Sequence, residues 1–317
     1  MRLVLRVSVL VIGLLAFASP VLAQAKKQTK AEYTRLQDVI YGRKHGLALT
    51  MDVFTPKKPN GLGIIFVVSG GWFSRPESIN VAFFNEFLLR GYTVFAVVHG
   101  SQPKFTLVEI VEDMHRAVRF IRYNAKRFGI DPDRLGVTGA SAGGHLSLML
   151  GTAGGPGNKL SADPVERVSS AVQAVACFFP PTDFLNWGKK GNEMIDRQLQ
   201  PPFTAAVDYH EFDQKRARYI PVTDPEELRK IARSVSPITH VKPTSAPALI
   251  IHGDKDTLVR IQQAESMIER YREMKVPAKL IVRKGAGHGW PNILDDLALF
   301  ADWFDEHLQK KSESQKN

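Results

Sequence analysis

A serine in a glycine-rich turn is the first residue of this chain that could carry out chemistry. The sequence LGVTGASAGGHLSLML (residues 135–150) places Ser141 in the pattern G-x-S-x-G. Residues 135–138 predict a short buried strand, and residues 145–150 favour a helix. A turn from strand to helix exposes the serine hydroxyl beyond the end of the sheet, where the N–H of the next residue, Ala142, faces any oxyanion that forms. The pattern therefore indicates a nucleophile for acyl transfer.

The glycines of this pattern have a steric reason. Side chains two positions before and after Ser141, at Gly139 and Gly143, would collide with the neighbouring strand and helix. Five-residue matches to G-x-S-x-G also occur by chance in long chains. A catalytic role for Ser141 is therefore indicated only if the sequence also offers catalytic partners for it.

A histidine near the C-terminus is a suitable base for this serine. His288 lies in the glycine-rich run GAGHGW after a predicted strand at residues 279–282. Imidazole titrates near neutral pH and can accept the serine proton. The alternative is a loop histidine with no role.

Two carboxylates follow another predicted strand, at residues 248–251. The sequence HGDKDTLV offers Asp254 and Asp256, either of which could orient the imidazole of His288. All parallel strands end at the same edge of a sheet, so an acid, His288 and Ser141 can meet there.

Several of these motifs resemble one family of enzymes. GASAGGHLSLML, with the preceding YNAKRFGIDPDRLGVTG, is similar to the nucleophile elbow of α/β-hydrolases, most closely the carbohydrate-esterase and hormone-sensitive-lipase-like branches that include feruloyl and acetylxylan esterases. The resemblance implies an α/β fold, with a mostly parallel central sheet, helices on both faces, and a lid insertion at about residues 182–247. In the loop H-G-x-x-D-x-x-V of that family the second acid belongs to the catalytic triad. The resemblance therefore implies a triad of Ser141, His288 and Asp256, with Asp254 organising the turn.

The same resemblance implies an oxyanion hole after the predicted strand at residues 63–68. The family ends this strand in a His-Gly-Gly-Gly-Trp-like loop, and alignment on Trp72 places Val68 at the histidine and Ser69 at the first glycine. Gly70 and Gly71 keep the donor positions and, with Ala142, are the expected oxyanion N–H donors. Because Val68 replaces the family's histidine, the sequence does not show which hydrogen bonds support this loop.

A histidine after the next predicted strand, at residues 93–98, is a further departure. Many relatives have a Tyr-Arg pair where this chain has His99-Gly100. His99 could line the mouth of the site or serve as a hydrogen-bonded structural histidine.

The N-terminus has the pattern of a secretory signal peptide over residues 1–23. Arg2 and Arg6 precede an apolar stretch, and Val21-Leu22-Ala23 resembles a cleavage site. The alternative is an uncleaved membrane anchor. Cleavage would leave one domain, residues 24–317, which we expect to be secreted or periplasmic and to have no stable membrane span. Cys177 is the only cysteine, so the domain has no internal disulfide; we interpret it as a buried strand residue.

Composition excludes few functions by itself. The formal net charge is +10, from 42 basic and 32 acidic residues, and the basic residues are scattered without a nucleic-acid motif. They indicate solubility or, less strongly, attraction to anionic polysaccharide. The histidines show no H-x-x-x-H or H-E-x-x-H spacing, and no phosphate-binding or dinucleotide fingerprint is present. We therefore expect neither a metal nor a cofactor.

Two longer helices are predicted around the expected site. Residues 79–89 and 107–128 each have an apolar stripe and end at a glycine. The lid segment is rich in proline and aromatic residues, with weak helices around Met194 and at residues 226–233. Its aromatic residues could form a platform for a sugar or aryl ring or could simply pack the lid; they are Phe184, Trp187, Phe203, Tyr209, Phe212 and Tyr219.

These features together predict a secreted serine carboxylesterase, with a small-molecule or polysaccharide ester as its substrate. The preference for acyl groups on carbohydrates follows from the resemblance and from the expected export alone. The alternatives are a prolyl-oligopeptidase-like serine peptidase, a lipase for longer acyl chains, and a hydrolase-fold protein that binds a ligand without catalysis.

Overall fold

The computed structural model describes residues 29–194 and 202–309 of the chain. The predicted signal peptide, residues 1–23, lies outside the described residues, as does much of the segment around Met194. Residues from Ala31 onward form one compact unit, and the description below concerns that unit.

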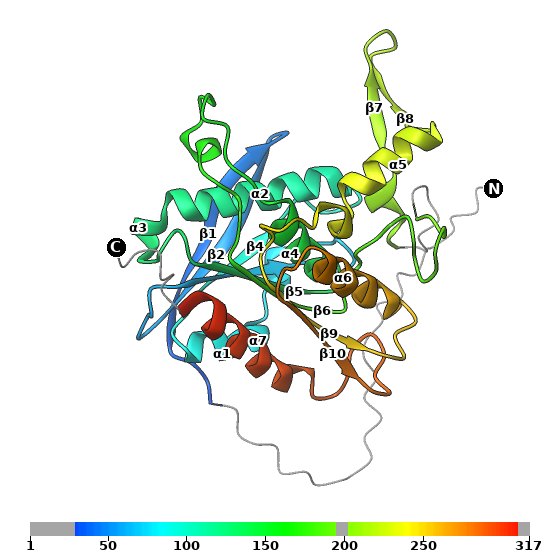
Figure 1. The fold of residues 1–317 in the computed structure, drawn as a ribbon. Coiled ribbons are helices and arrows are strands. Elements are labelled where there is room, and N and C mark those ends of the chain that lie inside the picture. The colour runs from blue at the N-terminus through cyan, green and yellow to red at the C-terminus, as the bar shows by residue number, and fades with distance from the viewer. Residues whose placement is uncertain (1–28, 195–201, 310–317) are drawn as a thin grey trace, which may run out of the picture. The chain divides into compact units, whose positions relative to one another are not determined.

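A sheet of eight strands forms the centre of the fold, in the order β1-β2-β4-β3-β5-β6-β9-β10 (Figure 1). Strands β1 and β2 pair antiparallel, as do β2 and β4, and the remaining neighbours are parallel. This is the mostly parallel α/β-hydrolase sheet expected from the sequence. The strands are β1 (Tyr33–Lys44), β2 (Leu47–Pro56), β3 (Gly63–Val68), β4 (Thr93–Val98), β5 (Leu135–Ala140), β6 (Ala174–Phe178), β9 (Ala248–Gly253) and β10 (Ala278–Arg283).

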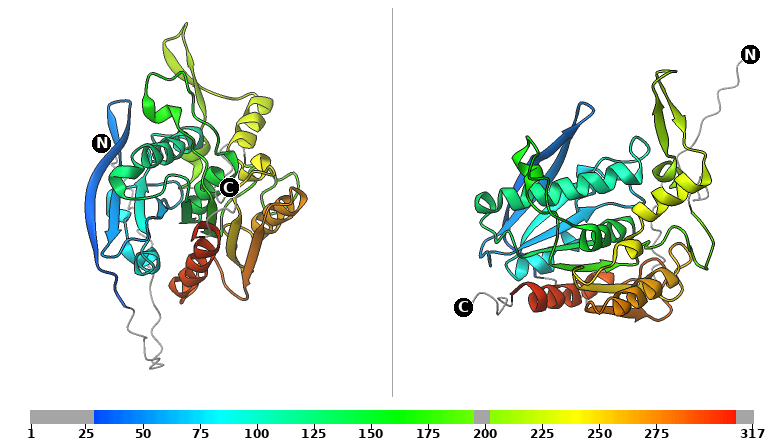
Figure 2. Two further views of the ribbon diagram at one scale, coloured as in Figure 1. Left: turned by 60° about the vertical axis from the view of Figure 1, so that its left-hand side comes forward. Right: turned by 45° about the horizontal axis from the view of Figure 1, so that its top comes forward.

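Helices cover both faces of the sheet, as Figures 1 and 2 show. One face carries α2 (Leu107–Tyr123), α4 (Ala142–Ala153) and α6 (Gln262–Glu273), whose buried side chains share one apolar core. The other face carries α1 (Asn85–Leu89) and α7 (Leu297–Phe304), which share a second core.

The alternation of side chains along the strands produces these two cores. In β3, Ile65 and Val67 belong to the core beneath α2 and α4, whereas Ile64 and Val68 belong to the core beneath α1 and α7. A strand buried on both faces must be apolar throughout, which is why GIIFVV could be predicted as a strand with its observed bounds. Cys177 of β6 is fully buried, as predicted.

The structure contradicts the prediction of one helix over residues 79–89. Two 3₁₀ turns, η1 (Pro76–Ser78) and η2 (Val81–Phe83), precede α1, which has only five residues. Phe84 separates η2 from α1 with φ −143° and ψ 10°, outside helical geometry. The Asn80 side chain accepts a hydrogen bond from the N–H of Ala82 and so begins a separate turn inside the predicted helix.

The predicted helix over residues 107–128 is also divided. It consists of α2 and the short α3 (Ala125–Phe128), because Asn124 leaves helical geometry at φ −98° and ψ 16°. Its side-chain amide donates to the carbonyl of Phe120 at 2.8 Å, a local bond that competes with helix continuation. The last helical segment of the fold is similarly divided into η6 (Ile293–Asp296), α7 and a π-helical turn (Asp305–Gln309).

Residues 182–247 contain a small antiparallel hairpin that the sequence did not predict. Strands β7 (His210–Asp213) and β8 (Arg218–Pro221) pair only with each other and project from the rest of the fold in Figure 1. The segment also contains η4 (Thr204–Val207), α5 (Pro225–Ser234) and η5 (Pro237–His240), and η3 (Pro164–Arg167) precedes it. Its assignment as a lid stays a prediction.

The packing of α7 gives a test of the second core. Phe304 is fully buried, and its ring lies 5.5 Å from that of Phe87 in an edge-on contact. Phe304→Ala should therefore lower the free energy of unfolding by about 3–5 kcal/mol, as removal of a buried aromatic ring typically does. Urea denaturation would measure the change. Leu160→Ala is the control, because Leu160 is 94% exposed; equal effects of the two substitutions would contradict this packing.

Candidate active site

Ser141 occupies the sharp turn that joins β5 to α4. Its backbone has φ 54° and ψ −118°, a conformation that is strained for a residue with a side chain. A Cβ at Gly139 would lie 2.6 Å from the backbone of Gly143, and one at Gly143 would lie 2.9 Å from the carbonyl oxygen of Val67. The two glycines of the pattern therefore allow α4 to approach β5 and β3 closely enough to form the turn.

The structure brings the side chains of Ser141, His288 and Asp256 together at the carboxyl edge of the sheet. They follow β5, β10 and β9 respectively. His288 Nε2 lies 2.9 Å from Ser141 Oγ, and His288 Nδ1 lies 2.6 Å from Asp256 Oδ2. Asp256 can only accept when ionised, so Nδ1 carries the proton and Nε2 is free to accept the serine O–H.

Asp256 is fixed as an ionised acceptor by the loop that carries it. Its Oδ1 accepts from the backbone N–H groups of Leu258 and Val259, each at 2.9 Å. His252 Nε2 donates to the carbonyl of Val259 and lies 3.4 Å from Asp256 Oδ2. Burial by itself raises the pKa of Asp256, but His252, His288 and the N–H of Val259 outweigh burial and hold this pKa well below its usual range.

Asp254 has a different task from the one expected, because its side chain bonds to another loop while the side-chain bonds within the turn come from Asp256. Asp254 Oδ1 accepts from the N–H of Gly285 at 2.7 Å, and the N–H of Lys255 donates to Ala286 at 2.9 Å. These bonds tie the loop after β9 to the loop of His288. Asp254 is thus a bridge between the two loops and has no contact with His288 itself.

The structure corrects one of the three predicted oxyanion donors. The N–H of Gly70 donates to the carbonyl of Phe73 at 3.0 Å within a small β-bridge, so it is not available to a substrate. Among the described residues no acceptor engages the N–H groups of Gly71 and Ala142, and both residues line the cavity at Ser141. These two remain the candidate donors.

Phe179 is a site residue that the sequence did not single out. It follows β6 directly, has φ 35°, and its ring centre lies 4.3 Å from that of His288. The ring limits the positions that the imidazole can adopt. The sequence offered only a weak signal, an aromatic residue directly before two prolines.

A cavity of about 190 Å³ opens at Ser141. Its walls are mainly apolar and combine the strand ends with the segment predicted as a lid; they include Gly71, Trp72, Pro181, Trp187, Met194, Phe203 and Leu258. Trp187 and Phe203 are thus the predicted lid aromatics that reach the site. Phe184 and Tyr209 are buried in the core, whereas Phe212 and Tyr219 are exposed on the hairpin.

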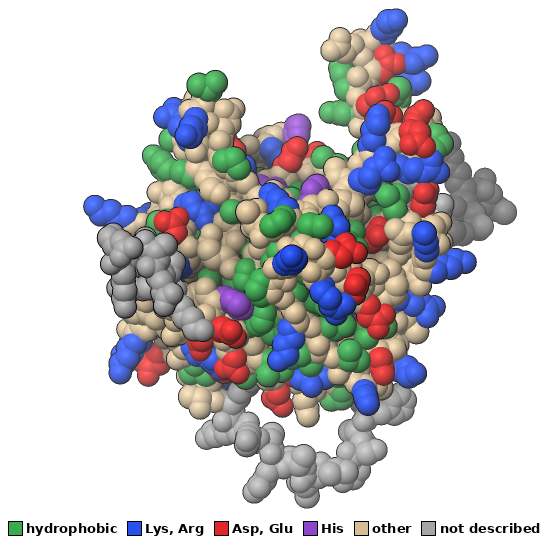
Figure 3. Space-filling model, viewed as in Figure 1, with side chains coloured by type: hydrophobic (Ala, Val, Ile, Leu, Met, Phe, Trp, Pro, Cys, Tyr) green, Lys and Arg blue, Asp and Glu red, His purple; other side chains and the backbone are tan. Residues whose placement is uncertain are grey.

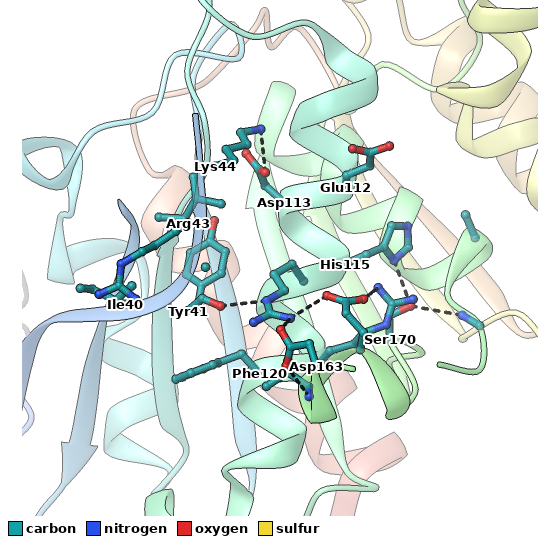
Figure 4. Close-up of a pocket in the computed structure, with 18 of the residues that line it drawn as sticks. Ile40, Tyr41, Arg43, Lys44, Glu112, Asp113, His115, Phe120, Asp163 and Ser170 are labelled. Carbon is teal, nitrogen blue, oxygen red and sulfur yellow. Dashed lines mark hydrogen bonds and ion pairs between the residues drawn. The ribbon is translucent and has the colours of Figure 1, made fainter. Parts of the chain in front are cut away.

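A larger cavity, of about 1000 Å³, lies between β1 and α2 (Figure 4). Its charged side chains bind one another: Lys44 pairs with Asp113 at 2.7 Å, and Arg116 pairs with Asp163 at 2.6 Å. It shares no lining residue with the cavity at Ser141. The larger cavity also holds a serine next to a histidine, since His115 Nδ1 lies 3.1 Å from Ser170 Oγ, but among the described residues no carboxylate bonds to His115. We therefore assign the candidate active site to the smaller cavity, where a nucleophile, a base and a carboxylate are joined.

The described part of the chain has neither a metal-binding cluster nor a membrane-spanning helix. No group of three or more His, Cys, Asp or Glu side chains there could hold a metal ion. No helix within residues 29–194 or 202–309 is long and apolar enough to cross a bilayer.

A known protein family matches a large part of this chain. The sequence profile of the BD-FAE family matches residues 51–271, a range that includes Ser141 and Asp256. The chain belongs to the BD-FAE family. His288 lies beyond the matched residues, and its contacts with Ser141, Asp256 and Phe179 place it in the site.

Individual proteins are also similar to this chain, and the solved structures among them support the fold. Esterase LipC of Mycobacterium tuberculosis is 28% identical over 83% of this chain and 61% of its own length, so the chain spans about 60% of that relative. A truncated carbohydrate esterase from gut microbiota is 24% identical, with a TM-score of 0.70 over 89% of this chain and 99% of that one. An acetyl ester-xyloside bifunctional hydrolase of Caldicellulosiruptor lactoaceticus is 20% identical, with a TM-score of 0.64 over 90% and 97% of the two chains.

The different contacts of the two acids give a direct test of the site. Asp256→Asn would remove the negative charge beside His288 and disturb its tautomer, so kcat for an ester should fall by about 10³–10⁴-fold. Asp254→Asn retains an acceptor oxygen for Gly285 and should change kcat by less than about tenfold. Steady-state kinetics of both variants would measure these effects. A larger loss in the Asp254 variant would contradict the assignment.

Proposed function

We propose that this protein is a serine carboxylesterase in which Ser141, His288 and Asp256 form the catalytic triad. The observation that carries the proposal is the continuous hydrogen-bonded chain from Asp256 through His288 to Ser141, at 2.6 and 2.9 Å, on the wall of a cavity. A hydrogen-bonded acid, base and nucleophile in this order is the arrangement that acyl transfer requires.

The proposed reaction has two halves. His288 Nε2 takes the proton of Ser141 as Oγ attacks the ester carbonyl, and the N–H groups of Gly71 and Ala142 stabilise the resulting oxyanion. Collapse of the tetrahedral intermediate breaks the bond to the alcohol, which receives the proton from His288. Water then attacks the acyl-enzyme with His288 again as base, releasing the acid and restoring Ser141.

We further propose that the substrates carry a short acyl group on a carbohydrate. The volume of about 190 Å³ at Ser141 favours a short acyl chain, and Trp187 and Phe203 offer aromatic surface for a ring. The solved structures named above include proteins described as a carbohydrate esterase and an acetyl ester-xyloside hydrolase. Basic and acidic side chains are interspersed over the face shown in Figure 3.

Export of the protein is part of this proposal. The basic start, the apolar stretch and the sequence Val21-Leu22-Ala23 support cleavage before Gln24. Expression of the full chain in a bacterial host should therefore give a mature protein that begins at Gln24, outside the cytoplasm. Cell fractionation and intact-mass analysis would measure this. Retention of Met1 on the folded protein would contradict cleavage.

Hydrolysis of a panel of substrates tests the activity and its specificity. Residues 24–317 should release acid from an aryl acetate and from acetylated xylan, and Ser141→Ala should reduce kcat by at least about 10³-fold because the nucleophile is lost. A long-chain aryl ester, a feruloylated sugar and a proline-containing peptide amide complete the panel. Thermal unfolding of the variant would verify that it remains folded.

Each other outcome of the panel has a definite meaning. Hydrolysis of only the long-chain ester would support a lipase, and cleavage of only the amide would support a peptidase. Inactivity toward every substrate, or equal rates for the wild-type and Ser141→Ala proteins, would contradict the proposed function.

A further inference from the structure

The loop of residues 69–72 has a backbone that needs support from outside. Gly71, the candidate oxyanion donor, has φ 55°, and Trp72 has φ 62°. Left-handed geometry at a bulky residue such as tryptophan is unfavourable by about 1 kcal/mol or more. The direction of the Gly71 N–H therefore depends on contacts that hold this loop in place.

His99 makes one such contact from the end of β4. It is 3% exposed; its Nε2 lies 2.9 Å from Ser69 Oγ and its Nδ1 lies 2.7 Å from the carbonyl oxygen of Gly100. A carbonyl oxygen can only accept, so Nδ1 carries the proton. Nε2 is then the acceptor, and the Ser69 hydroxyl must donate to it.

Burial keeps this ring in one protonation state. Burial lowers the pKa of His99 to about 4, although the bond to Gly100 opposes the change. His99 is consequently neutral near neutral pH. The hydrogen bond to Ser69 thus has a fixed direction under conditions in which His288 would act as a base.

Three further side chains hold the same loop. Gln102 donates from its side chain to the carbonyl of Gly71 and from its backbone to that of Trp72. Trp72 Nε1 donates to Nδ1 of the buried His145 at 3.2 Å. Ser74 Oγ donates to the carbonyl of Val68 at 2.5 Å and accepts from the N–H of His99 at 3.2 Å.

The family's His-Gly-Gly-Gly-Trp-like loop begins with a histidine. In this chain the same position is Val68, a residue of the apolar core. Val68 is 2% exposed and packs with α1 and α7 on the opposite face of the sheet from α4. Its side chain therefore makes no polar contact with the loop. Ser69, which replaces the first glycine of that loop, is the residue that contacts His99. The replacements at residues 68 and 69 are therefore explained together: the loop is supported by a histidine of the neighbouring strand and not by one of its own.

We propose that His99 and Ser69 form a positioning pair that orients the Gly71 N–H toward the developing oxyanion. The pair provides from the neighbouring strand the support that the loop sequence itself lacks. Neither residue reacts with the substrate, so both act through Gly71. This inference rests on the proposed esterase function and adds two residues to its machinery.

Four variants of residues 24–317 test the pair. Ser69→Ala removes the hydroxyl, and His99→Asn retains a donor for Gly100 but is too short to reach Ser69. Ser69→Ala combined with His99→Asn completes a double-mutant cycle. His99→Gln is the matched control, because its longer side chain can place an amide oxygen near Ser69. The kcat and KM for an aryl acetate are measured for each variant, per folded enzyme determined by thermal unfolding.

The expected result is a loss in kcat that depends on the bond between the two residues. Ser69→Ala and His99→Asn should each lower kcat by about 10–100-fold, with KM changed less than about threefold, since the oxyanion forms only in the transition state. The double variant should lose little more than the worse single variant, and His99→Gln should retain most of the wild-type kcat. Equal loss in the Asn and Gln variants, additive losses, or unchanged kcat would overturn the inference.

The wild-type protein separates failure of this inference from failure of the proposed function. If wild type hydrolyses the ester with dependence on Ser141 but the variants match it, only the positioning pair is wrong. If wild type hydrolyses no ester at all, the esterase function and the pair both fall.

Discussion

The conformation of Ser141 is the constraint on which the rest of the site depends. A backbone at φ 54° and ψ −118° is unfavourable and persists only because β5 and α4 are both anchored on either side of it. The anchoring is steric: a Cβ at Gly139 would meet the backbone of Gly143 at 2.6 Å, and one at Gly144 would meet the carbonyl oxygen of Phe178 at 2.9 Å. The close packing of α4 against the sheet therefore fixes Ser141 and directs the N–H of Ala142 into the same cavity.

Parallel strands extend this constraint to the other two members of the site. Strands β9 and β10 are neighbours in register, so the loops that follow them begin at the same level. Hydrogen bonds from Gly285 and Lys255 then tie those loops together. The result is that His288 contacts residues that are 147 and 32 positions away in the chain without any strained geometry of its own.

The sequence predicted correctly those elements and site residues whose pattern has one main physical cause. The apolar runs of β3 and β4 gave both strands with their observed bounds, because only a strand buried on both faces needs such a run. Ser141 and His288 were found through glycine-rich turns and the order of the strands, whereas Asp256 was separated from Asp254 only by the resemblance of its loop to H-G-x-x-D-x-x-V. The helix breaks at Phe84 and Asn124 were missed, because an apolar stripe continues across both residues although their backbones leave helical geometry.

Other features of the site could not be predicted, because they depend on contacts that form only in the folded protein. Gly70 was expected to be a donor because it is small, yet its N–H is engaged by Phe73 in a bridge visible only in three dimensions. Phe179 meets His288 across 109 positions of sequence. The role of His99 was likewise open until Ser69 was found 2.9 Å from its ring. Such pairings follow from the sheet topology and carry little signal in the sequence alone.

The central claim is that Ser141 is the one nucleophile of this site. Covalent labelling with a fluorophosphonate, followed by peptide mapping, tests it most directly because the reagent traps an activated serine without requiring the natural substrate. We predict one adduct per chain, located at Ser141, and none after mild unfolding separates Ser141 from His288. An adduct at another serine, or no adduct on the folded protein, would contradict the account.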